Sequence, residues 1–210
     1  MFRNVWESLV NFVVEKIIGP VRWDNRDPVT EEQKFEIEKR LVDDYYIIVT
    51  RRKTHLSTFF INLGHWFLTF KWGFYTHVLM NLEDEVASPE DFRLIEAVGV
   101  GTKYSTLDEI LVDVDSIALL KPVSMTLDDW TAAMDRAKQY LYTPYDTLFD
   151  LKTDYKISCV ELIRLAMQAV PDYGLKFANF EKMIADNRNL TPQMFLDCPD
   201  FHIVYEIRNK

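Results

Sequence analysis

The spacing of apolar residues changes several times along this chain, between helical and strand periods, and this constrains its fold more than any other feature. Residues 30–44 (TEEQKFEIEKRLVDD) begin with an N-cap Thr and acidic first-turn residues, which favours a helix. Short runs rich in β-branched and aromatic residues follow, and we expect strands in YYIIVTRR, FYTHVLMNL, RLIEAVGVG and SIALLKPV. A helical turn is expected at 107–111, a helix over about 127–142, a helix starting near Ser158, and a last strand in FHIVYEI. This order predicts an α+β fold in which an antiparallel sheet packs against helices.

The first residues form an additional amphipathic segment. Apolar side chains recur at helical spacing from Phe2 to Ile17, the pattern stops at Gly19-Pro20, and a polar linker, DNRDP, follows. Packing of this helix on its own domain is the favoured interpretation, with docking to a membrane surface or a larger assembly as alternatives. We therefore divide the chain into an N-terminal helical extension (1–42) and a main domain (43–210).

The charge balance excludes some partners. The chain has 24 Lys and Arg against 33 Asp and Glu, a formal net charge of -9, so it has no strong basic field for a nucleic-acid backbone. Charged residues interrupt the apolar start, and glycine, lysine and histidine punctuate the longest apolar run, so we expect neither a signal peptide nor a transmembrane segment. A cytoplasmic location, or a place in a phage-like particle, is the resulting expectation.

The two cysteines differ in their local setting. Cys159 lies in SCVELIRLAMQAVP, where Ser158 and Glu161 have capping-box spacing, so Cys159 should occupy the first helical position. The unpaired amides and positive dipole of a helix start favour a thiolate, which a nucleophilic cysteine requires. The alternative is a small buried apolar residue. Cys198, in DCPD, has no helix start and is interpreted as structural or incidental. Neither cysteine has disulfide or metal-ligand spacing, so no metal or cofactor is expected.

A nucleophilic thiol needs a base, and four histidines are candidates. His77 lies inside the predicted strand FYTHVLMNL, where the backbone could hold its ring. His55 follows a basic segment, His65 stands between Gly64 and Trp66 as a packed residue would, and His202 lies in the last run. Each histidine, taken alone, is more often structural than catalytic.

A third group should orient the imidazole. If FYTHVLMNL and RLIEAVGVG form an antiparallel hairpin with Glu96 directly opposite His77, their Cβ atoms would lie about 4.5 to 5.5 Å apart. A slip of one residue would turn Glu96 to the other face, and Asn81 is the substitute. Tyr145 could stabilise an oxyanion through its hydroxyl or nearby amides, or it could cover the core; Tyr155 is the second choice.

Several motifs in order resemble the permuted NlpC branch of papain-like enzymes, and the YiiX-like group most closely. These are the strand with Thr-His, a later EA-G-V, a strand ending in KP, then PYD, and a Cys-x-Glu-Leu helix. In that group the His strand precedes the Cys helix, the reverse of papain, and the resemblance spans roughly Asp43 to Phe201. It implies a circularly permuted papain-like fold with Cys159 as nucleophile, His77 as base, Glu96 as acidic partner and Tyr145 as helper. Two departures are the long acidic stretch NLEDEVASPEDF after the His strand and Val160 in place of a small residue.

The resemblance implies a cysteine hydrolase that forms a thioacyl-enzyme and needs no cofactor. Its expected substrate is an amide bond in cell-wall-type peptides. Relatives of the permuted branch include lecithin:retinol acyltransferase, so a lipid acyl hydrolase or acyltransferase is the alternative. The rival from another class is a catalytically weak structural or binding protein of a larger assembly, because fold alone does not fix function.

Overall fold

The computed structural model of this chain describes residues 27–52, 74–82, 93–112, 114–146, 155–187 and 191–209. Several expectations above lie outside these ranges, among them the amphipathic segment from Phe2 to Ile17, His55, His65 and residues 83–92 of the acidic stretch.

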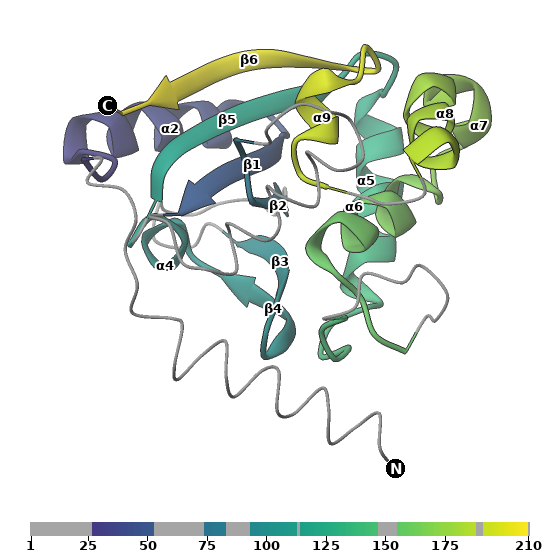
Figure 1. The fold of residues 1–210 in the computed structure, drawn as a ribbon, viewed down its shortest axis with the longest axis horizontal. Coiled ribbons are helices and arrows are strands. Elements are labelled where there is room, and N and C mark those ends of the chain that lie inside the picture. The colour runs from purple at the N-terminus through teal and green to yellow at the C-terminus, as the bar shows by residue number, and fades with distance from the viewer. Residues whose placement is uncertain are drawn as a thin grey trace.

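The described strands form one antiparallel sheet in the order β4-β3-β2-β1-β5-β6. Their bounds are β1 Ile47–Arg52, β2 His77–Asn81, β3 Leu94–Val98, β4 Gly101–Ser105, β5 Val114–Pro122 and β6 Phe201–Arg208. The described helices are α2 Glu31–Asp43, α4 Leu107–Leu111, α5 Leu127–Lys138, α6 Cys159–Met167, α7 Tyr173–Lys176, α8 Ala178–Asn187 and α9 Met194–Asp197. Figure 1 shows β6 along one edge of the sheet and β4 at the other. The prediction of an α+β fold with an antiparallel sheet is confirmed.

Helices cover both faces of the sheet. The side chains of a strand alternate between its two sides, so one strand can contribute to two separate cores. Ile47 and Val49 of β1 belong to a core shared with α5 and α6, whereas Ile48 belongs to a second core shared with α2 and α4. In Figure 1, α5 and α6 lie to the right of the sheet and α2 and α4 to the left. The near-continuous apolar run IIV at the start of β1 is therefore buried on both sides of the sheet.

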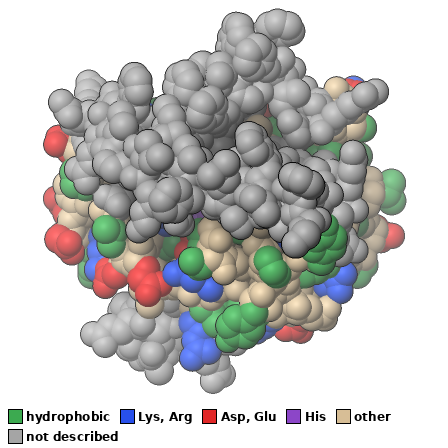
Figure 2. All heavy atoms as spheres, turned by 60° about the horizontal axis from the view of Figure 1, so that its bottom comes forward, with side chains coloured by type: hydrophobic (Ala, Val, Ile, Leu, Met, Phe, Trp, Pro, Cys, Tyr) green, Lys and Arg blue, Asp and Glu red, His purple; other side chains and the backbone are tan. Residues whose placement is uncertain are grey.

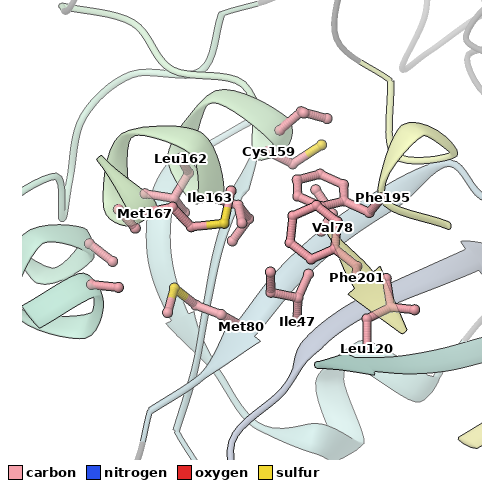
Figure 3. Close-up of a cluster of buried hydrophobic side chains, with 14 of the residues drawn as sticks. Ile47, Val78, Met80, Leu120, Cys159, Leu162, Ile163, Met167, Phe195 and Phe201 are labelled. Atoms are coloured by element: carbon pink, nitrogen blue, oxygen red, sulfur yellow. The ribbon is translucent and has the colours of Figure 1, made fainter. Parts of the chain in front are cut away.

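Helix α6 is fixed at its start by capping and along its length by burial. The Ser158 hydroxyl accepts from the Glu161 amide at 3.3 Å, and the Glu161 carboxylate accepts from the Ser158 amide at 2.8 Å. Leu162, Ile163 and Met167 are buried against the sheet, as Figure 3 shows together with Val78 and Met80 of β2. Burial of each such side chain contributes roughly 1.5–3 kcal/mol, so this packing holds the helix start at the sheet.

One local expectation was wrong, and one strand was not predicted. Helix α5 ends at Lys138 rather than near Tyr142, because residues 139–142 turn away and Tyr142 adopts a left-handed backbone with φ of 66°. Strand β4 was not expected, because GTKYS lacks an apolar run; pairing with β3, from Leu94↔Ser105 to Val98↔Gly101, makes it a strand. Both differences place residues near the candidate site.

Candidate active site

Cys159 is the first residue of α6, as expected. Its side chain is 3% exposed and projects from the first turn of the helix at the edge of the apolar cluster (Figure 3). The capping box uses the amides of Ser158 and Glu161. The amide of Cys159 has no acceptor within the helix, because the first N–H groups of any helix lack one. The sulfur thus lies beside a helix start that offers N–H donors.

His77 begins β2, and contacts on both sides hold the strand there. Thr50 of β1 lies directly opposite His77, and the Thr76 amide donates to the Thr50 carbonyl at 3.0 Å. Just before the strand, the side-chain oxygen of Gln193 accepts from the amides of Phe74 and Tyr75 at 3.0 and 3.3 Å. Gln193 was not singled out from the sequence, because its partners lie more than a hundred residues away.

Nε2 of His77 lies 2.7 Å from Oε2 of Glu96, and both side chains are buried. The predicted register was wrong: Met80 lies opposite Ile95 rather than Arg93, so Glu96 is not directly opposite His77. The contact survives because a shift of two residues keeps a side chain on the same face of the sheet.

Asn81 does not orient the imidazole. Its side-chain oxygen accepts from the Tyr46 amide at 2.5 Å, and its amide nitrogen donates to the Asp44 carbonyl at 2.9 Å. Asn81 thus anchors the chain that enters β1.

The pKa values of His77 and Glu96 are shifted in opposite directions, so both groups are charged at neutral pH. Burial alone would lower the pKa of His77, but hydrogen bonds to Cys159 and Glu96 outweigh it and raise the pKa to about 9. Burial alone would raise the pKa of Glu96, but the hydrogen bonds from His77 and Ser105 outweigh it and lower the pKa to about 2. Since Glu96 occupies Nε2, Nδ1 is the ring nitrogen left for the Cys159 thiol. The structure therefore brings the predicted thiol, imidazole and carboxylate together in that order.

Tyr145 reaches the same thiol from the loop before α6. A parallel bridge joins Tyr145 to Ile157, with the Ile157 amide donating to the Pro144 carbonyl at 2.9 Å. The half-buried Tyr145 has a pKa raised well above its ordinary value, first by burial and then by its interaction and hydrogen bond with Cys159. Its hydroxyl therefore stays protonated next to the sulfur and can donate.

Strand β4 holds the loop that carries Tyr145. The Tyr142 amide donates to the Thr102 carbonyl at 2.8 Å, and the Thr102 amide donates to the Thr143 carbonyl at 2.9 Å. Gly101 lies so close to this loop that an added Cβ would meet the Thr143 oxygen at 2.8 Å, and its φ is +112°. The close approach of β4 to this loop therefore requires glycine at position 101.

The remaining candidates lie apart from this group. Cys198 is buried, and burial, only partly offset by a backbone hydrogen bond with Asp200, raises the pKa of its thiol to about 12. His202 is exposed on β6, and Tyr155 is 57% exposed. In the ranges that the structure describes, no three His, Cys, Asp or Glu side chains are placed to hold a metal ion. No helix within those ranges has the length and apolar character to cross a bilayer.

Comparisons with known proteins concern the family and the fold of the chain. The sequence profile of the permuted papain-like amidase enzymes, YaeF/YiiX, C92 family, matches residues 46–205. The crystal structure of metalloprotein yiiX from Escherichia coli O157:H7 superposes with a TM-score of 0.54 at 19% identity, covering 77% of this chain and 96% of that one. That likeness concerns the fold. No curated protein matches the sequence significantly.

Proposed function

The chain belongs to the permuted papain-like amidase family YaeF/YiiX, C92, and is therefore a cysteine hydrolase; from this premise we propose that it cleaves amide bonds in cell-wall-type peptides. The observation that carries the proposal is the connected group of Cys159, His77 and Glu96. The 2.7 Å bond between His77 and Glu96 and the hydrogen bond between His77 and Cys159 form a relay that suits acyl transfer.

In the proposed reaction, Nδ1 of His77 already holds the proton taken from Cys159, in keeping with the raised pKa of His77, and the sulfur attacks the carbonyl carbon of the scissile amide. The carbonyl π electrons move to oxygen, which gives a tetrahedral oxyanion. His77 then gives its proton to the amide nitrogen as the C–N bond breaks, so the amine leaves neutral and a thioester remains. Glu96 keeps the imidazole oriented and stabilises its protonated form, which matches the raised pKa of His77.

Two donors are placed to stabilise the oxyanion. The Tyr145 hydroxyl interacts with the Cys159 sulfur and stays protonated, and the Cys159 amide is a first-turn N–H of α6. Preorganised donors of this kind act strongly because they need no reorientation as the charge develops.

Water completes the cycle. His77 takes a proton from a water molecule whose oxygen attacks the thioester carbon. The C–S bond then breaks, the carboxylic acid is released, and the proton held by His77 restores the Cys159–His77 pair for the next cycle. The net reaction is amide plus water to amine plus acid.

The charge of the molecule supports a small amide or peptide rather than a polyanion. Its formal net charge is -9, and on the face in Figure 2 basic and acidic side chains of the described residues are interspersed. A nucleic acid would meet repulsion from much of such a surface.

The test is to incubate the protein with stem peptides released from peptidoglycan and, separately, with a fatty-acyl amide, and to follow products by mass spectrometry. We expect new amine and acid fragments from the stem peptides, and none with Cys159→Ala. Cleavage of the fatty-acyl amide alone would instead assign the enzyme to the lipid acyl branch. Cleavage that persists in Cys159→Ala would refute the thiol mechanism.

A further inference from the structure

We propose that Ser105 is a positioning residue that fixes the rotation of the Glu96 carboxylate and through it the ring of His77. The inference rests on the proposed function, because it assigns Ser105 a role in the same site. The Ser105 hydroxyl donates to Oε1 of Glu96 at 2.6 Å, while Oε2 bonds to Nε2 of His77 at 2.7 Å. Each carboxylate oxygen thus has its own short hydrogen bond.

A glutamate carboxylate needs such a second contact to hold one orientation. Its terminal torsion is broad and has little intrinsic preference, so neighbouring groups decide where the two oxygens point. A bond to His77 alone would let the carboxylate turn about that contact. The bond from Ser105, on a strand that is hydrogen-bonded to β3, removes this freedom.

The strand pairing explains how Ser105 reaches Glu96. Lys103 of β4 lies directly opposite Glu96, and Ser105 lies opposite Leu94. Residues two apart on a strand share a face, so Ser105 is the diagonal neighbour of Glu96 on the same side of the sheet. Ser105 is also buried, so water does not compete strongly for its hydroxyl.

Lys103 also lies near this oxygen, but it is less suited to the role. Its Nζ lies 3.7 Å from Oε1, and its side chain is 37% exposed and also lies 3.5 Å from Glu109. An exposed, shared ammonium group is screened and mobile. The short buried bond from Ser105 should therefore set the geometry.

The test is the second-order rate of alkylation of Cys159 by iodoacetamide at neutral pH, followed at the peptide level by mass spectrometry. This readout reports the state of the Cys159–His77 pair without any substrate. We expect Ser105→Ala to slow alkylation on the order of tenfold, as loss of a group that orients a functional side chain often does. Ser105→Thr, which keeps the hydroxyl, should stay within about twofold of the natural protein.

Ser116 provides a matched control. Its hydroxyl donates to the buried Asp115 carboxylate at 2.7 Å in β5, so Ser116→Ala removes a similar bond away from His77. It should match Ser105→Ala in its effect on the melting temperature and leave alkylation unchanged. Slowing of the same size in Ser116→Ala would mean that the effect is a general loss of stability, and would overturn the proposal.

A double-variant cycle decides whether Ser105 acts through Glu96. Ser105→Ala should have no further effect in a Glu96→Ala background. A full additional tenfold loss there would overturn the proposal. Slowing by Glu96→Ala but not by Ser105→Ala would overturn the role of Ser105 and leave the proposed function intact. If Glu96→Ala does not slow alkylation, Glu96 does not orient His77, and both assignments fail.

Discussion

Glu96 and His77 are joined by a 2.7 Å hydrogen bond although the pairing of their strands does not set them directly opposite each other. The glutamate side chain is long enough to span the diagonal between two neighbouring strands. Its second oxygen then faces β4, where Ser105 binds it. The diagonal placement thus allows one carboxylate to join three strands.

This contact predicts a stability that depends on pH. The folded pKa of Glu96 is lowered from 4.5 to about 2, so its contribution is fully present above 4.5 and is lost as pH falls towards 2. The shift corresponds to about 3 kcal/mol of unfolding free energy at neutral pH. Urea unfolding should show that natural protein and Glu96→Gln differ most at neutral pH and converge in acid. A difference that stays constant down to the acid limit would contradict a buried, ionised Glu96.

The stability that protonated His77 contributes changes with pH in the opposite direction. The folded pKa of His77 is raised from 6.5 to about 9, so the contribution of the imidazolium is fully present below 6.5 and is lost as pH rises through 9. The natural protein should therefore lose stability relative to His77→Gln over this interval. The two shifts share the contact between His77 and Glu96, so their free energies are not added together.

Tyr145 should matter for turnover through its hydroxyl alone. Tyr145→Phe keeps the ring and removes the donor next to the Cys159 sulfur, and we expect kcat/KM to fall by about a hundredfold. The control is Tyr142→Phe, three residues earlier, because Tyr142 is 85% exposed. Equal activity of the two variants would exclude Tyr145 as an oxyanion donor.

Gly101 should couple strand β4 to the position of Tyr145. Gly101→Ala places a Cβ 2.8 Å from the Thr143 oxygen at a φ of +112°, so we expect a loss of about 1–3 kcal/mol in unfolding free energy and a severalfold fall in kcat/KM. Gly99→Ala is the control, because a Cβ there meets nothing within 4 Å. If Gly101→Ala melts at the same temperature and turns over as fast as Gly99→Ala, the loop does not depend on this close approach.

The helix starts that were predicted correctly from sequence are set by neighbouring residues. Ser158 and Glu161 determine the start of α6, and their spacing alone places Cys159 at the first helical position. Thr30 similarly marks the start of α2. In both cases the capping residues lie within one turn of each other, so no knowledge of the rest of the chain is needed.

The features that were missed depend on contacts between distant segments. The register of β2 and β3 depends on how the two strands pair and pack in the whole sheet, which the pattern of either strand does not encode. Ser105 lies in a strand without an apolar run, and Gln193 acts on a strand that is far away in sequence. Serine and glutamine are common surface residues, so their types gave no signal of a role at the site.

The account depends most directly on Cys159 being a nucleophile that His77 activates. Limited reaction of the folded protein with iodoacetamide at neutral pH, quantified at each cysteine by mass spectrometry, tests this claim. Cys159 should react first, since it contacts His77, whereas Cys198 has a thiol pKa of about 12 and should stay unmodified. His77→Ala should slow the reaction of Cys159 by at least about tenfold without affecting Cys198. Reaction of Cys198 as fast as that of Cys159, or an unchanged Cys159 rate in His77→Ala, would contradict the account.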